Sequence, residues 1–202
     1  MFRVVASSVR GPAHYREGLP CQDAWLAVPK DGACIAVVAD GLGSRDNART
    51  GARAATLAAR DAWQHWRRSA VGSTEDLIRL VEVCWRLRLS DTPPETACTT
   101  CLLYVEDGRG RAALAQLGDG ILVRRRSAGK VEVHPSRSRF AGCTEALGAP
   151  HHLADWNLAT STALVAGEAI MMATDGVAED LEPARITDLV TWVIEDLGRR
   201  PQ

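Results

Sequence analysis

Two aspartates stand where an apolar run ends and a glycine follows. Asp40 closes the run in IAVVADGLGS (35–44), and Asp175 closes the run in AIMMATDGV (169–177). A carboxylate at the end of a buried strand needs compensation, because an isolated buried charge is costly. Divalent cations such as Mg²⁺ prefer carboxylate, carbonyl and water oxygens, so these acids could hold a metal. Asp-Gly is also a common turn dipeptide, so two ordinary turns are the alternative.

Further acids lie at other predicted strand ends. Asp23 precedes a strand in LPCQDAW, Asp119 lies between two strands in AQLGDGILV, and Glu179 follows Asp175 within about one turn. Acids that converge from both halves of the chain are what a two-metal hydrolytic site needs. These further acids strengthen the interpretation as a metal site, and ordinary strand-end turns remain the alternative.

The elements that must position these acids follow from hydrophobic periodicity. Alanines and tryptophans recur at helical spacing over 47–68, and a second helix begins at Ser73, where Asp76 completes a capping box. A third helix is predicted over 186–198. Strands are predicted at 2–9, 24–28, 33–39, 96–105, 111–118, 120–126, 130–135 and 164–173, and the segment 135–159 reads as irregular.

Strands, then two helices, then more strands and a last helix form an α+β order rather than β-α-β alternation. Antiparallel sheets with helices packed outside are the expected architecture. No repeat or linker interrupts the chain, so residues 1–202 are expected to form a single domain. Arg124–Arg126 are expected at a solvated strand edge, and His151 and His152 in a loop with ordinary hydrogen bonds.

Composition limits the possible partners and compartment. The formal net charge is −1, which gives no electrostatic reason to expect nucleic acid or an anionic membrane. No apolar run reaches the roughly 20 residues that span a bilayer, and the N-terminus lacks a signal-peptide pattern, so we expect a cytoplasmic protein. The six cysteines are expected as buried free thiols. Cys98 and Cys101 lack the second Cys or His pair of a zinc site.

The motifs together resemble the metal-dependent protein phosphatases of the type 2C family, most closely a compact bacterial branch. The matching stretches are GLPCQDA (18–24), VVADGLGS (37–44), TACTTCLL (96–103), LGDG (117–120) and MATDGV (172–177), in the family order. Each motif is weak alone, but five in register over most of the chain are specific. The resemblance implies a four-layer αββα sandwich with a Mn²⁺ or Mg²⁺ site, two ions per site, at one edge.

The resemblance also implies a role for each acid. Asp40 matches the acid that bridges the two metals, Gly41 the residue that lends its backbone carbonyl, and Asp175 a terminal ligand. Asp23 matches an acid that orients metal-bound water. The acids Asp119 and Glu179 fall where the family holds a third, weaker metal.

The sequence departs from the family at three places. The family often has Glu where Gln22 stands, and Gln22 offers only a neutral oxygen to the second metal. A phosphate-holding arginine is replaced by Gly18, so Arg16 or His14 in the same loop are the substitutes, with a solvated loop charge as the alternative for each. The closing strand and its acidic motif have no match: we expect that the chain stops before them, with an incompletely held first metal as the alternative.

The implied activity is hydrolysis of phosphoserine and phosphothreonine in proteins by a metal-activated water, opposing a bacterial Ser/Thr kinase. Expected partners are phosphorylated proteins, a Ser/Thr kinase and a von Willebrand A-type protein. Two alternatives stay open: a phosphatase-like binding or regulatory module with weak turnover, and a small-molecule phosphomonoesterase.

Overall fold

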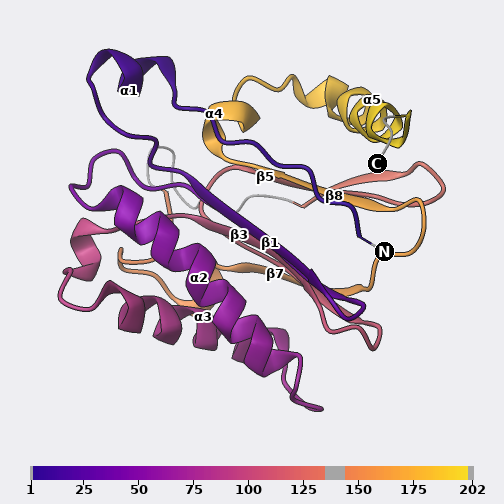
Figure 1. Cartoon of the computed structure of the whole chain (residues 1–202), viewed down its shortest axis with the longest axis horizontal. Coiled ribbons are helices and arrows are strands. Elements are labelled where there is room, and N and C mark those ends of the chain that lie inside the picture. Colours follow the sequence, from indigo (N-terminus) through magenta and orange to yellow (C-terminus); the bar gives the residue numbers. More distant parts are fainter. Residues whose placement is uncertain (1, 135–143, 200–202) are drawn as a thin grey trace.

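The computed structural model describes residues 2–134 and 144–199, which form two antiparallel sheets enclosed by helices (Figure 1). Helices α2 and α3 cover one sheet, and α5 covers the other. The α+β sandwich expected from the sequence is confirmed.

The strands are β1 (Ala24–Lys30), β2 (Ala33–Ala39), β3 (Cys101–Glu106), β4 (Arg111–Leu117), β5 (Ile121–Arg125), β6 (Val131–His134), β7 (Asn157–Thr162) and β8 (Ala169–Ala173). The α-helices are α1 (Pro12–Arg16), α2 (Ala48–Trp66), α3 (Thr74–Leu89), α4 (Asp175–Ala178) and α5 (Ile186–Arg199), with short 3₁₀ turns at Pro94–Thr96, Leu153–Asp155 and Pro183–Arg185.

The larger sheet has five strands in the order β1-β2-β3-β4-β7. The β1–β2 hairpin pairs Ala24 with Ala39. Asp23 directly precedes Ala24 and Asp40 directly follows Ala39, so both acids lie at the same end of the sheet, on neighbouring strands. Strand β2 also pairs with β3, with Val38 opposite Leu102, and this pairing joins the hairpin to the rest of the sheet. Strand pairing alone therefore brings two of the predicted acids together.

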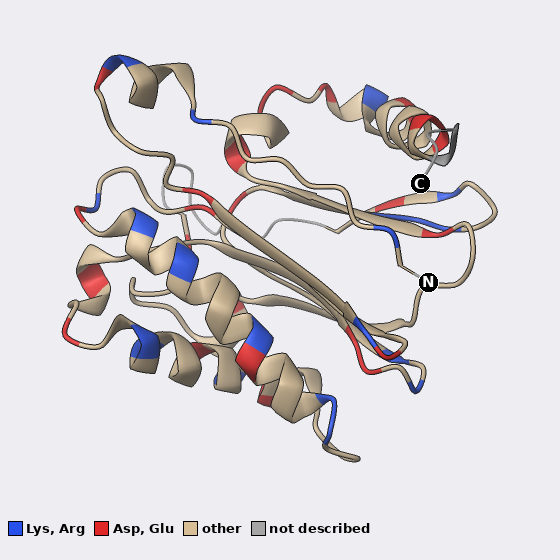
Figure 2. Cartoon of the chain, in the orientation of Figure 1, with Lys and Arg blue, Asp and Glu red and all other residues tan. Residues whose placement is uncertain are grey.

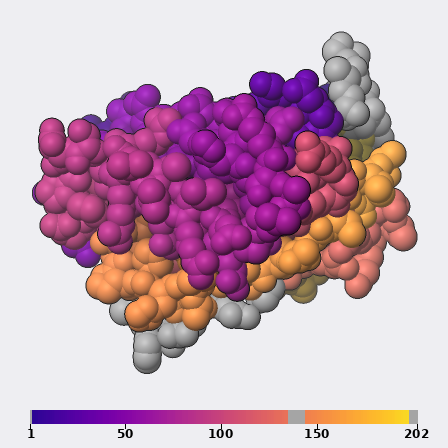
Figure 3. All heavy atoms as spheres, turned by 90° about the horizontal axis from the view of Figure 1, so that it is seen from below, coloured from indigo at the N-terminus to yellow at the C-terminus, as the bar shows by residue number. Residues whose placement is uncertain are grey.

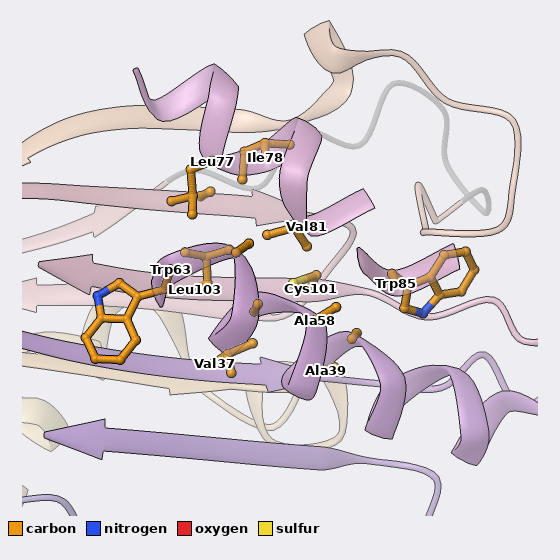
Figure 4. Close-up of a cluster of buried hydrophobic side chains, with 14 of the residues drawn as sticks. Val37, Ala39, Ala58, Trp63, Leu77, Ile78, Val81, Trp85, Cys101 and Leu103 are labelled. Carbon is orange, nitrogen blue, oxygen red and sulfur yellow. The ribbon is translucent and has the colours of Figure 1, made fainter. Parts of the chain in front are cut away.

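Helices α2 and α3 cover the outer face of this sheet, and Figure 3 shows them spread over one face of the molecule. The predicted capping box at the start of α3 is present: the Ser73 hydroxyl accepts from the Asp76 N–H, and the Asp76 carboxylate accepts from the Ser73 N–H. The alanine-rich face of α2 allows close packing against the strands. The two helices and the sheet therefore share one core (Figure 4).

Tryptophans fix this core by hydrogen bonds as well as by packing. Trp63 and Trp85 are fully buried, and their indole N–H groups donate to the carbonyls of Glu106 and Gly51 at 2.9 and 3.0 Å. A buried indole N–H needs such a partner, because leaving it unpaired costs free energy. Trp66 is buried in the same core.

The smaller sheet has three strands in the order β6-β5-β8, and α5 packs on its outer face through Ile186, Val190 and Ile194. Every residue of β8 is only partly buried, whereas every residue of β3 is buried. Arg124 in β5 is 2% exposed and pairs with Glu168 at 2.6 Å, so the expectation of a solvated edge was wrong for this arginine. The cause is that β5 turns Arg124 toward the end of β7, where Thr162 also accepts a hydrogen bond from it.

Two other predictions about secondary structure were wrong. Residues 2–9, expected as a strand, have no regular secondary structure, and β7 occupies residues that were expected to be irregular. The strand pattern of Phe2–Val9 forms no ladder with a neighbour, whereas the polar segment NLATST pairs along β4 from Arg111 to Gln116. Backbone pairing, which composition does not reveal, decided both cases. The part of the irregular prediction that covers 135–143 lies outside the described residues.

The described cysteines carry no disulfide. Cys21, Cys34, Cys84, Cys98 and Cys101 are free, and Cys143 lies outside the described residues. Cys98 precedes β3 and donates weakly to the Glu95 carbonyl, while Cys101 opens the strand and is fully buried. Within 2–134 and 144–199, none of the helices is both long and apolar enough to cross a bilayer.

Candidate active site

Three of the predicted acids meet beside a cleft of about 1870 Å³ that β1, β2, β8 and the N-terminal segment enclose. Asp23 and Asp40 reach it from the β1–β2 hairpin, and Asp175 reaches it from the first residue of α4, directly after β8. Figure 2 shows acidic segments gathered where the strands end below α4. The two sheets thus contribute to one acidic cluster, as the sequence pattern predicted.

The electrostatics of this cluster are unfavourable without a cation. Burial, a hydrogen bond to the Asp175 carboxyl and the charge of Asp23 together raise the pKa of Asp40 from 3.8 to about 10. Crowded carboxylates cannot all ionise unless a positive charge is close, so one of them retains a proton. The same arrangement favours divalent cations, which would take the place of that proton.

The backbone of Asp40 is held firmly. Its carbonyl accepts from the Thr99 hydroxyl and the Thr100 N–H, each at 2.8 Å, and its N–H donates to the Thr100 hydroxyl at 3.0 Å. Gly41 follows because no side chain fits: an added Cβ would lie 2.5 Å from the Ala48 carbonyl oxygen at the start of α2. Close packing against α2 therefore requires glycine at this position.

Gln22 supplies the strongest sign that the cluster is a ligand site. Its side chain is 9% exposed, and its oxygen Oε1 is buried with no hydrogen-bond partner in the described part of the chain. This oxygen lies beside the loop after Asp40, where an added Cβ on Gly43 would be 3.5 Å from it. A buried acceptor left unpaired is costly, so this oxygen is free to accept from a water or to bind a cation.

The donor set fits Mn²⁺ or Mg²⁺, since it consists of carboxylate, amide and backbone carbonyl oxygens. Among the described residues, no three His, Cys, Asp or Glu side chains form a ready-made metal-binding group. A cation held here would also need neutral donors, and the Gln22 oxygen and the Gly41 carbonyl are the predicted ones.

The remaining predicted site residues are not joined to this cluster. Asp119 lies in the β4–β5 turn and accepts from the Thr144 hydroxyl at 2.7 Å, and Glu179 is an exposed residue after α4. In the described residues, no hydrogen bond or ion pair links either acid to Asp40. His14 lines the cleft, whereas Arg16 is exposed at the end of α1. Their proposed roles stay predictions.

Four threonines around the acids were missed by sequence reasoning. Thr99 and Thr100 hold the Asp40 backbone, Thr174 donates to Asp23 Oδ2 at 3.3 Å, and Thr144 holds Asp119. Thr99, Thr100 and Thr174 stand inside motifs that were noted, TACTTCLL and MATDGV. The signal that could have identified these threonines was a hydroxyl side chain next to a predicted acid, either in the sequence or on a neighbouring strand.

Solved structures resemble this fold at low sequence identity. PppA, described as a key regulatory component of T6SS in Pseudomonas aeruginosa, superimposes with a TM-score of 0.62 at 19% identity over 85% of this chain and 77% of PppA. The photosystem II phosphatase PBCP gives a TM-score of 0.67 at 16% identity over 91% and 70% of the two chains. The catalytic domain of the serine/threonine phosphatase PstP, solved with two manganese ions, gives 0.61 at 16% identity over 85% and 78%.

Sequence comparisons show the family. No curated protein matched the chain. The sequence model of the family described as protein phosphatase 2C matches residues 10–200, which is nearly the whole chain. With the two-sheet sandwich and the five motifs in order, that match shows that the chain belongs to the protein phosphatase 2C family.

Proposed function

We propose that this protein removes phosphate from phosphoserine and phosphothreonine in proteins, in a reaction that depends on Mn²⁺ or Mg²⁺. The observation that carries the proposal is the meeting of Asp23, Asp40 and Asp175 at the end of the cleft, beside the unpaired buried oxygen of Gln22. Family membership supports the reaction class, and the manganese ions described for PstP support the choice of metal.

Each residue has a defined task in this proposal. Asp40, Gly41 and Asp175 hold two cations, with Gln22 as a neutral donor to one of them, and Asp119 and Glu179 are assigned to a third, weaker site. Bound cations would activate water and neutralise the phosphoryl oxygens. Asp23, oriented by the Thr174 hydroxyl, positions the attacking water and accepts its proton. His14 and Arg16 bind the substrate phosphate from the α1 loop.

The proposed setting is a bacterial cytoplasm, where the enzyme opposes a Ser/Thr kinase and associates with that kinase and a von Willebrand A-type protein. The free state of the five described cysteines supports a reducing compartment. Similarity to PppA, a regulatory component in its own organism, supports a signalling role.

The test compares a phosphothreonine peptide with p-nitrophenyl phosphate, with and without Mn²⁺. We expect Mn²⁺-dependent turnover of both, with a higher kcat/KM for the peptide, and loss of turnover in Asp40→Asn. Asp91→Asn is the matched control, because Asp91 is an exposed aspartate in the turn after α3. Asp40→Asn activity equal to that of Asp91→Asn would refute the assignment.

The binding-module alternative is favoured by Gln22, where the family often has Glu, by Gly18 in place of a phosphate-holding arginine, and by the unmatched closing acid. It predicts that the wild type binds a phosphothreonine peptide in the presence of Mn²⁺ but releases no phosphate. A preference for small phosphomonoesters over the peptide would instead support the phosphomonoesterase alternative.

A further inference from the structure

Thr100 contacts both the Asp40 backbone and the turn that carries Asp119. Its hydroxyl accepts from the Asp40 N–H at 3.0 Å, and its own N–H donates to the Asp40 carbonyl at 2.8 Å. On its other side, its methyl group packs on the LGDG turn: a Cβ added to Gly118 would lie 2.7 Å from the Thr100 methyl carbon. One buried side chain thus contacts the residue before Gly41 and the residue before Asp119.

The surrounding backbone makes this contact rigid. Gly41 bridges to Thr99, and Thr99 bridges in turn to Leu147, with hydrogen bonds of 3.1 and 2.9 Å between Thr99 and Leu147. Thr144, three residues before Leu147, donates to Asp119. The short segment 98–100 is therefore flanked by the Asp40 loop on one side and by the segment that holds Asp119 on the other.

Thr100 is 1% exposed, and Gly118 has φ of 91°, a conformation that suits glycine. The glycine lets the turn approach the Thr100 methyl closely, so the position of Asp119 depends on that methyl. The hydroxyl acts on the other acid, because a fixed Asp40 backbone restricts where its carboxylate points. Hydroxyl and methyl thus have separable effects.

We propose that Thr100 is a positioning residue whose hydroxyl fixes the Asp40 backbone and thereby sets the affinity of the acidic site for divalent cations. This inference rests on the proposed function only in assuming that the acids bind such cations. Groups that hold metal ligands in place typically change metal affinity by about 10–100-fold when they are removed. Thr100 acts less directly, because it bonds to the backbone of the proposed ligand Asp40 and not to its carboxylate.

The experiment separates the hydroxyl from the methyl in the full chain. Thr100→Val keeps the shape and removes the hydroxyl, whereas Thr100→Ser keeps the hydroxyl and removes the methyl. The matched control is Thr56→Val, since Thr56 is also buried but its hydroxyl donates to Arg53 within α2, away from the acids. Mn²⁺ binding is measured by the electron paramagnetic resonance signal of free Mn²⁺, and unfolding by circular dichroism without metal.

We expect Thr100→Val to raise the Kd for Mn²⁺ about tenfold, with kcat largely recovered at saturating Mn²⁺. Thr100→Ser should keep the Kd within about threefold and lower the melting temperature by about 2–4 °C, as expected for a lost buried methyl in a chain of this size. Thr56→Val should leave the Kd unchanged.

Equal Kd values for wild type and Thr100→Val would overturn the inference, as would an equal change in Thr100→Ser or Thr56→Val. If Thr100→Val does not fold, Thr100→Ser still decides, because a tenfold rise in its Kd contradicts the assignment to the hydroxyl. A wild type that binds Mn²⁺ without hydrolysing phosphoesters would refute the proposed function but leave this comparison valid. A wild type that binds no Mn²⁺ overturns both.

Discussion

The two halves of the sandwich differ in how firmly they hold their part of the site. Asp40 leaves the five-stranded sheet, where β2 is paired on both sides and shares a core with α2 and α3. Asp175 follows β8, which among the described strands lies at the edge of the three-stranded sheet, pairs only with β5 and is only partly buried. The backbone of Asp40 is therefore held more firmly than that of Asp175, which follows a partly buried strand at the edge of the smaller sheet.

This asymmetry has a functional consequence for a site built from both halves. In the proposed site a cation would join Asp40 to Asp175, and it would thereby also join the firmly packed sheet to the loosely packed one. A ligand that binds only the folded arrangement stabilises it in proportion to the logarithm of its concentration. Metal binding is therefore expected to stabilise the smaller sheet more than the larger one.

The largest expected effect comes from removing the acids themselves. Asp40→Asn and Asp175→Asn should each lower kcat/KM about 1000-fold or more, since metal ligands supply several kcal/mol of transition-state stabilisation. Raised Mn²⁺ should restore part of the activity of Asp175→Asn but none of that of Asp40→Asn, because Asp40 contacts both cations in the proposal. Activity measured across a Mn²⁺ series checks this, and recovery of Asp40→Asn would contradict the bridging role.

The second prediction compares the cores of the two halves with the same substitution. Ile35 in β2 is fully buried, whereas Ile170 in β8 is only partly buried. Ile35→Ala should cost about 2–5 kcal/mol of the free energy of unfolding, and Ile170→Ala about 1–2 kcal/mol. Urea unfolding followed by circular dichroism measures both. Equal losses would show that the smaller sheet is as tightly packed as the larger one.

The fold was predictable from sequence where the signals are local and less so where an element depends on a neighbouring strand. Alanine spacing in α2 and the Ser73–Asp76 capping box mark elements whose signals are local, and both were confirmed. The segment 2–9 failed, because its alternating pattern says nothing about whether a neighbouring strand is available to pair. β7 was missed for the converse reason, since its ladder with β4 compensates for a polar sequence.

The acids were easier to find from sequence than the residues that position them. Asp40 and Asp175 interrupt apolar runs, which is visible in one dimension. Thr100 meets Asp40 across 60 residues, and Thr174 meets Asp23 across 151, so these hydrogen bonds exist only once the strands are paired. Such contacts follow from strand register, and a single sequence does not specify register at these sites.

The third prediction tests the neutral donor. Gln22→Glu should raise the affinity for Mn²⁺ about tenfold, equivalent to ~1.4 kcal/mol, because it adds a negative charge where the buried Oε1 has no partner. Without metal the same change should lower stability, since it adds a charge to crowded carboxylates. Titration with Mn²⁺ measures the first effect and thermal unfolding the second. An unchanged Kd would exclude Gln22 from the cation site.

The fourth prediction concerns a pH-dependent contact within the larger half. His151 hydrogen-bonds to Glu82 on α3 at 3.1 Å, and this contact raises the pKa of His151 above 6.5. The stabilisation is therefore fully present below pH 6.5 and is lost as pH rises through the folded-state pKa. His151→Gln should cost about 1 kcal/mol at pH 6 and less at pH 9. Unfolding at both pH values, with the exposed His65→Gln as control, measures it; a cost independent of pH would contradict the charged pair.

The smallest effect is expected in the loop that contains α1, where no residue of the helix is buried. Arg16 is exposed and His14 lines the cleft, so neither side chain lies in a buried environment that would strengthen its electrostatic interaction with a phosphate. Exposed charge pairs contribute about 0.2–1 kcal/mol, so Arg16→Ala should raise KM for a phosphopeptide about threefold and leave kcat unchanged. His14→Ala should act in the same direction. Because the effect is electrostatic, it should shrink at high salt, whereas the loss in Asp40→Asn should not. A drop in kcat with unchanged KM would move these residues from substrate binding to the chemical step.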